Sequence, residues 1–223
     1  PIADVGLDRQ INIPLGASTV DVTLTGLAST DSDGTIAAYT WTGTPDPEDI
    51  AEPVVTLGSG RYDFTLVVTD DDGAESFPDA VTIVVNAPPI ANAGPDQSLN
   101  LPSDIIEGKA ILPEMAVTLD GAASSDSDGS IVTYTWTGTD AEPDDIAQPI
   151  LNLGAGEHTF TLVVTDDSGA VSAPDTVAIY INTPPTAVAT ATPNPVSADD
   201  ITEAVPTMDA SVLYALDRRS PES

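Results

Sequence analysis

The residues of this sequence that could do chemistry are aspartates gathered in short turns with glycine. DSDG occurs at 31–34 and again at 126–129, and DDDG at 70–73 is matched by DDSG at 166–169. Grouped carboxylates repel one another unless a cation lies between them or some are protonated. Hard oxygen ligands on short side chains suit Ca²⁺, and paired carboxylates in a cleft can hydrolyse glycosides. Three interpretations follow: turn formation, cation binding and acid–base catalysis.

Turn formation explains part of this pattern. Aspartate closes turns by accepting hydrogen bonds from nearby backbone amides, and we expect Gly34 and Gly129 to supply the positive φ of a tight hairpin. Turn chemistry alone does not explain why several carboxylates gather.

Internal repetition sets the frame that positions these turns. Asp31, Trp41 and Gly43 recur 95 residues later as Asp126, Trp136 and Gly138. Paired prolines at 88–89 and 184–185 stiffen the chain where one copy ends and the next begins. We therefore expect domains at 1–87 and 88–183, with 184–223 as an incomplete third module or a strand-donating tail.

Hydrophobic periodicity indicates strands in both copies. In GRYDFTLVVTD at 60–70, the residues Tyr62, Phe64, Leu66 and Val68 face one way. No segment has a convincing helical stripe. Short alternating strands with turn signals between them, and a tryptophan on the third, predict an all-β fold of tandem immunoglobulin-like β-sandwiches joined by Pro-Pro linkers. We expect both tryptophans in the cores; the alternative is a platform for sugars.

The motifs resemble those of a known family. AGPDQ at 93–97, VTLDGAASSDSDGSIVTYTW at 117–136 and GEHTFTLVVTDDSGAVS at 156–172 are similar to PKD-type (polycystic kidney disease) domains of prokaryotic surface proteins. The resemblance covers residues 1 to about 183 and implies extracellular, tandem, non-catalytic modules that act as spacers, in adhesion, or in binding sugars and protein surfaces. The sequences after the tryptophans, TGTPDPED and TGTDAEPDD, depart from the DFGDG of many such domains.

The sandwich topology brings the acidic turns together. The loop at 28–35 and the turn at 69–74 should lie at one end of the first sandwich, and their counterparts should lie beside the linker in the second. We expect a calcium ion at the domain junction, and the resemblance supports this expectation because related PKD domains bind calcium near this turn. The candidate ligands are Asp31, Asp33, Asp70, Asp71, Asn86, Asp126, Asp128, Asp166 and Asp167.

Composition limits the other functions. With 36 acidic against 5 basic residues, the chain has a formal net charge of −31 and repels nucleic acid and anionic lipid. It has no cysteine and a single histidine, His158, which aligns with Tyr62 on the inward face of a strand. No apolar run is long enough to span a membrane. We therefore predict a protein that is not an enzyme.

The function predicted from these observations is a structural or adhesive spacer on a prokaryotic cell surface, whose partners are other copies, surface proteins or glycans. Two alternatives stay open. The chain could be the subunit of a self-assembling filament or surface layer, with the tail PPTAVATATPNP as a donated strand. It could also be a carbohydrate-binding accessory region of a secreted enzyme. The acidity also fits a halophile, whose proteins carry such surfaces.

Overall fold

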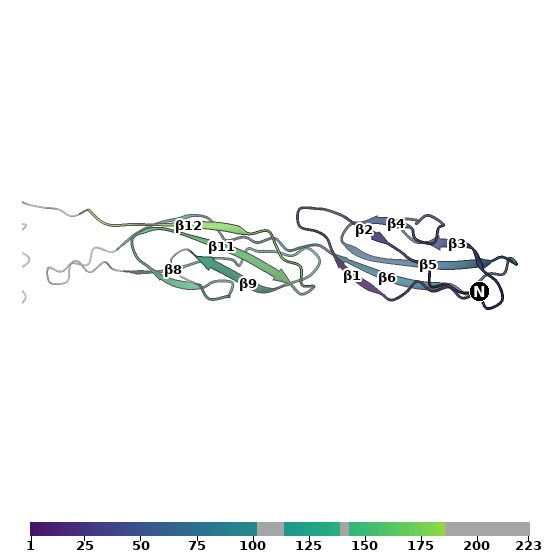
Figure 1. The fold of residues 1–223 in the computed structure, drawn as a ribbon. Helices are drawn as coiled ribbons and strands as arrows, with labels where there is room; N and C mark the ends of the chain where they lie inside the picture. Colours follow the sequence, from purple (N-terminus) through teal and green to yellow (C-terminus); the bar gives the residue numbers. More distant parts are fainter. Residues whose placement is uncertain (102–113, 139–142, 186–223) are drawn as a thin grey trace, which may run out of the picture. The chain divides into compact units, whose positions relative to one another are not determined.

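The protein forms two β-sandwiches in a computed structural model that describes residues 1–101, 114–138 and 143–185 (Figure 1). No helix occurs within these ranges. The strands of the first sandwich are β1 (Arg9–Asn12), β2 (Val20–Thr23), β3 (Ile36–Thr42), β4 (Val54–Leu57), β5 (Gly60–Asp70) and β6 (Asp79–Asn86). Those of the second are β7 (Gln97–Asn100), β8 (Met115–Thr118), β9 (Ile131–Gly138), β10 (Ile150–Leu153), β11 (Gly156–Asp166) and β12 (Asp175–Asn182).

Each sandwich packs a four-stranded sheet against a two-stranded one. The larger sheets have the orders β1-β6-β5-β3 and β7-β12-β11-β9, and the smaller ones pair β2 with β4 and β8 with β10. The first strand of each copy runs parallel to the last, and the other neighbours are antiparallel. The all-β tandem fold predicted from periodicity and repetition is confirmed.

The core of each copy lies between its two sheets and repeats residue by residue. Trp41 and Trp136 are each 2% exposed, so both belong to the core as predicted. Around them lie the inward-facing residues of the long central strand, Phe64, Leu66 and Val68 in the first copy. Burial of each such side chain stabilises the fold by about 1.5–3 kcal/mol.

The loops after the tryptophan strands protect an open sheet edge. The backbone amide of Trp41 donates to Asp49 Oδ1 at 2.7 Å, and its indole Nε1 donates to the carbonyl oxygen of Ile50. In the second copy, Trp136 makes the same two hydrogen bonds, to Asp145 and Ile146. The loop whose sequence departs from DFGDG therefore accepts a hydrogen bond from a backbone amide at the sheet edge, which would otherwise be free to pair with another chain.

The chain divides into two compact units, Pro1–Pro184 and Pro185–Ser223. The predicted incomplete module or strand-donating tail lies almost wholly outside the described residues, and the domain boundaries at 87 and 183 stay predictions. Within the described residues, no helix has the length and hydropathy needed to cross a membrane.

Candidate functional site

Two acidic turns lie side by side at one end of each sandwich. In the first copy, the backbone amide of Thr35 donates to Asp71 Oδ1 at 2.7 Å, and the Asp71 amide donates back to the Thr35 carbonyl oxygen. Ser130 and Asp167 repeat both hydrogen bonds in the second copy. The hydrogen bond from the Thr35 amide lowers the pKa of the Asp71 carboxyl, so Asp71 stays charged.

The glycines of the DSDG turns have a different role from the one expected. Gly34 and Gly129 are not among the residues with positive φ, which include Gly73 and Gly169 in the partner turns. A Cβ atom on Gly129 would lie 2.7 Å from Asp126 Oδ2 and closer still to Asp167 Oδ1. The prediction of positive φ was wrong. Glycine is needed here because two carboxylates approach the backbone.

Asp166 joins a turn to the preceding domain. Its Oδ1 accepts hydrogen bonds from the amides of Ser168 and Ala170, which closes the turn after β11. Its Oδ2 accepts a hydrogen bond from the side-chain amide of Asn86 at 2.8 Å, and Asp166 as a residue is 1% exposed. Asn86, at the end of β6, is itself buried.

The linker makes a second hydrogen bond to the same end of the second sandwich. The backbone amide of Ala87 donates to Asp128 Oδ2 at 3.0 Å. Asn86 and Ala87 are consecutive residues, so the two hydrogen bonds hold the start of the linker against both acidic turns. Asn86, Asp128 and Asp166 from the predicted ligand set therefore meet at the junction.

Asp126 lies beside these residues without a hydrogen-bond partner. Both of its carboxylate oxygens are buried, and neither takes part in a hydrogen bond within the described residues. Burial raises the pKa of the Asp126 carboxyl, and the neighbouring charges of Asp128 and Asp166 raise it further. The amides of Asp128 and Ser127 point toward it and oppose the rise, but they do not reach hydrogen-bond geometry.

The equivalent residue of the first copy has partners. Asp31 Oδ1 accepts a hydrogen bond from the Ser32 amide at 2.9 Å and lies 3.4 Å from the charged amino group of Pro1. Asp31 thus has a hydrogen-bond partner, whereas the carboxylate oxygens of its counterpart Asp126 have none within the described residues.

Some oxygen atoms at the junction could coordinate a hard cation, but the carboxylates alone do not surround one. Both carboxylate oxygens of Asp126 accept no hydrogen bond from the described residues. The Ala87 amide donates to Oδ2 of Asp128, which leaves Oδ1 of that residue available to a cation. Among the described residues, no three acidic or histidine side chains are arranged as a metal-binding group. A cation here would therefore complete its shell with backbone carbonyl oxygens and water, which Ca²⁺ commonly accepts.

The other candidate residues lie at the open end of the first copy. Asp70 closes its turn through the amides of Asp72 and Ala74, as Asp166 does. Asp33 accepts a long hydrogen bond of 3.4 Å from the Ser32 hydroxyl. Sequence reasoning did not identify the Ala87 amide or the close approach at Gly129, because both depend on the contact between turns rather than on residue type.

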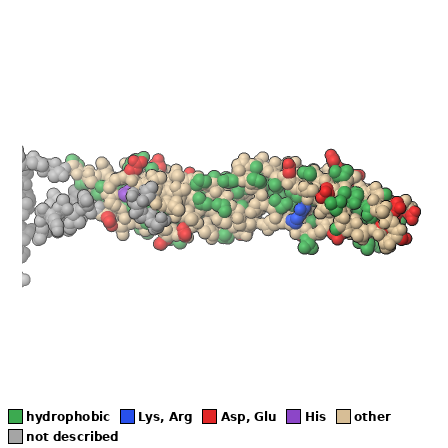
Figure 2. All heavy atoms as spheres, in the orientation of Figure 1, with side chains coloured by type: hydrophobic (Ala, Val, Ile, Leu, Met, Phe, Trp, Pro, Cys, Tyr) green, Lys and Arg blue, Asp and Glu red, His purple; other side chains and the backbone are tan. Residues whose placement is uncertain are grey.

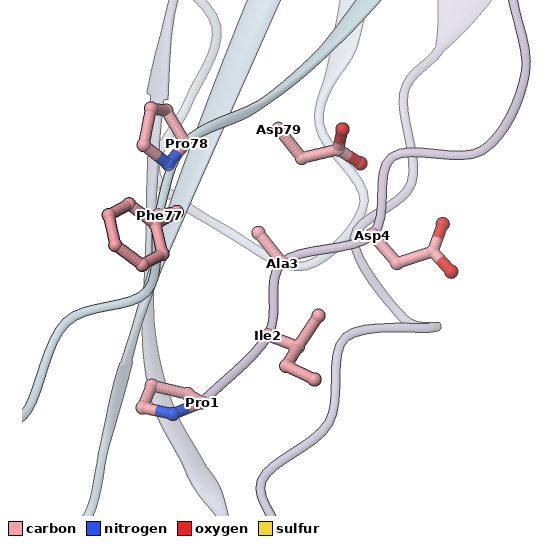
Figure 3. A pocket seen from close by; sticks show the side chains of 7 residues that line it. All are labelled: Pro1, Ile2, Ala3, Asp4, Phe77, Pro78 and Asp79. Atoms are coloured by element: carbon pink, nitrogen blue, oxygen red, sulfur yellow. The ribbon is translucent and has the colours of Figure 1, made fainter.

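Two shallow hollows lie on the described part of the chain, and the residues that line them form no catalytic arrangement. The first, of about 410 Å³, lies between Pro1–Asp4 and Phe77–Asp79, with Phe77 and Pro78 across from Ile2 and Ala3 (Figure 3). Its carboxylates are engaged by backbone amides, Asp79 with Val5 and Asp4 with Gly6. The second, about 400 Å³, is lined by residues that include Tyr180 and Asn182.

His158 is not placed for catalysis either. It is half-buried, and its Nε2 lies 3.0 Å from the carbonyl oxygen of Gly154, so this nitrogen carries the proton. The hydroxyl of Tyr62, its counterpart, makes the same contact with Gly58.

Comparison with known proteins places the chain in a family. The K319L-like PKD domain matches residues 6–85 and 93–181, one match per sandwich. The chain is 35% identical over 213 residues to the human Dyslexia-associated protein KIAA0319, which covers 85% of this chain but only 18% of the human protein. It is 29% identical over 178 residues to Halomucin of Haloquadratum walsbyi, covering 77% of this chain and 2% of Halomucin.

A solved structure with a related sequence is the PKD domain from KIAA 1837 protein. It is 30% identical, covers 44% of this chain and 92% of that domain, and superposes with a TM-score of 0.33. The relatives occur in mammals as well as in Haloquadratum walsbyi and Vibrio cholerae, so the resemblance extends beyond prokaryotic proteins. The match over both sandwiches shows that the chain belongs to the K319L-like PKD domain family.

Proposed function

We propose that this chain is a non-catalytic structural or adhesive segment of an extracellular protein, and that a calcium ion stiffens the joint between its two PKD domains. The observation that carries the proposal is the buried carboxylate of Asp126, which lacks a partner next to two further aspartates at the junction. A buried charge of this kind is costly unless it is paired.

The direct contacts between the domains support a spacer. Asn86 and Ala87 donate to carboxylates of the second domain, so the joint has specific polar contacts in addition to its paired prolines. A cation bound by Asp126 and Asp128 would add to these contacts, because Asp128 also holds the linker through Ala87. PKD domains are typical of extracellular regions, which supports a location at the cell surface. A prokaryotic source stays part of the proposal.

Calcium titration by isothermal calorimetry tests the metal site. The full chain, freed of metal by a chelator, should bind one Ca²⁺ at the junction. Asp126→Asn should abolish this binding, whereas Asp31→Asn, the matched change in the first domain, should leave it. The absence of binding at millimolar Ca²⁺, or equal loss in both variants, would remove calcium from the proposal.

The stiffening is tested separately by the motion of the two domains. Asn86→Ala removes the side-chain donor to Asp166, and NMR relaxation should then give the two domains more independent rotational correlation times. Asn182→Ala, at the equivalent exposed position after the second domain, is the control and should change nothing. Equal correlation times in wild type and Asn86→Ala would show that this hydrogen bond does not hold the joint.

A further inference from the structure

The outward face of the four-stranded sheet differs from the rest of this acidic chain. In the second domain, the exposed side of β9 carries Thr133, Thr135 and Thr137. Strand β11 places Thr165, Val163 and Thr161 directly opposite them in the antiparallel register. We call these six residues the threonine face.

The threonine face continues onto β12 without a charge. Thr176 pairs with Thr161, and Ala178 pairs with Thr159 on the same side of the sheet. The charged residues at its margin are Glu157, opposite Tyr180, and Asp96, whose Oδ1 accepts a hydrogen bond from the Ala178 amide. The charge of Glu157, together with that of Asp96, raises the pKa of the Tyr180 phenol.

The first domain repeats this arrangement. Thr40, Thr42, Thr65, Val67 and Thr69 stand at the positions of Thr135, Thr137, Thr161, Val163 and Thr165. At the margin of that side, Arg61 and Asp63 form an ion pair at 3.2 Å, and Asp8 accepts a hydrogen bond from the Thr82 amide. Both copies therefore keep the same neutral surface on a chain whose formal net charge is −31.

Within the described residues, the hydroxyls of the threonine face make no hydrogen bond. No described hydrogen bond involves the side chains of Thr133, Thr135, Thr137, Thr161 or Thr165. By contrast, other outward hydroxyls of the protein are engaged, such as Thr56 with Asp21 and Ser124 with Asn92. In the view of Figure 2, acidic side chains are spread over the surface, with a basic group in blue among them.

We propose that the threonine face is a self-association surface, on which the sheet of a second copy of this chain packs. The distribution of charge on the chain favours this face for contact between two copies. Two copies that approach with most other surfaces bring carboxylates together, and like charges in an interface cost several kcal/mol. The threonine faces meet without this cost and offer β-branched side chains and hydroxyls that can hydrogen-bond across the interface.

Salt should strengthen this association, because the repulsion between the remaining acidic surfaces is screened as ionic strength rises. An association made through ion pairs would instead weaken as salt rises. An association made through bound cations would be lost in chelator. The surface is independent of the calcium site, and the measurements are therefore made in chelator, so that failure of one proposal leaves the other standing.

Sedimentation equilibrium of the full chain tests the proposal, in chelator and at low and high sodium chloride. We expect a reversible dimer whose association constant rises with salt. Thr135→Asp places a carboxylate at the centre of the face and should weaken the dimer by at least about tenfold. Thr118→Asp is the matched control, because Thr118 is exposed on β8 in the other sheet, and it should leave the dimer unchanged.

A cysteine variant provides a second measurement that does not depend on an added charge. The natural chain contains no cysteine, so Thr135→Cys introduces the only thiol. Under mild oxidation it should form a disulfide-linked dimer much faster than Thr118→Cys. A chain that stays monomeric at high salt, a dimer that Thr118→Asp disrupts equally, or binding of a neutral glycan without self-association would overturn the proposal.

Discussion

Asp31 and Asp126 occupy equivalent positions in the two domains, yet their surroundings differ. Asp31 accepts a hydrogen bond from the Ser32 amide, whereas the buried carboxylate oxygens of Asp126 accept none from the described residues and lie near the charges of Asp128 and Asp166. Identical turn sequences therefore have different electrostatic states.

The pH dependence of stability should reflect this state of Asp126. Its pKa is raised in the folded protein, so protonation favours folding, and this contribution is lost as pH rises through the folded pKa. In chelator, Asp126→Asn should raise the melting temperature more at pH 7 than near the pKa of an unfolded aspartate. Thermal unfolding over a pH series measures this difference, and Asp31→Asn is the control. An equal effect of Asp126→Asn at all pH values would contradict the raised pKa.

The close approach at Gly129 gives a second prediction for a single residue. Gly129→Ala places a Cβ atom against the carboxylates of Asp126 and Asp167 and should break the hydrogen bond from Ser130 to Asp167. We expect destabilisation of about 1–3 kcal/mol in chemical denaturation. Gly154→Ala, where a Cβ atom meets nothing within 4 Å and φ is not positive, should be close to neutral. Similar effects of the two changes would contradict the steric role of Gly129.

At the scale of the elements, strand β9 and the loop after it explain how an acidic chain protects a sheet edge. Asp145 accepts the hydrogen bond of the Trp136 amide, and Trp136 fills the core from the same strand. The acidic sequence after the tryptophan thus contributes to the fold, and Asp49 has the same role in the first domain.

Removal of this carboxylate should weaken the edge. Asp145→Ala leaves the Trp136 amide without its acceptor, and we expect a loss of about 1 kcal/mol together with a greater tendency to aggregate. Asp144→Ala, at the exposed neighbouring residue, removes the same charge and serves as the control. Urea denaturation and light scattering measure the two effects. Equal behaviour of both variants would show that charge, rather than the hydrogen bond, matters at this edge.

The sequence predicts elements well where the pattern is local. Period-two alternation in β5 and β11 places Phe64, Leu66 and their counterparts in the core, and the repeat predicts two sandwiches. The role of Gly129 and the hydrogen bonds from Asn86 and Ala87 were not predictable, because they arise where turns from distant parts of the chain meet. The edge role of Asp49 and Asp145 was not predictable either, although each lies close to its tryptophan in sequence, because it depends on the conformation of the loop that returns the carboxylate to the strand.

At the scale of the whole molecule, the chain spans only a small part of the curated relatives that it matches. It spans 18% of the human relative and 2% of Halomucin, so the activity and partners of such a protein belong to the proposal. The −31 charge keeps copies apart except where a cation or a neutral face intervenes. The two proposals, calcium at the junction and self-association through the threonine face, would each reduce the effect of that charge in a different way.

The central claim, a calcium ion bound by Asp126 at the joint, is tested most directly by calorimetric unfolding of wild type and Asp126→Asn with and without Ca²⁺. In chelator, Asp126→Asn should be the more stable protein, because the buried charge is gone. In Ca²⁺ at about 100 times the dissociation constant, wild type should gain about 2.7 kcal/mol and become the more stable. The order of stability should therefore reverse, and an order that is the same in chelator and in Ca²⁺ would contradict the account.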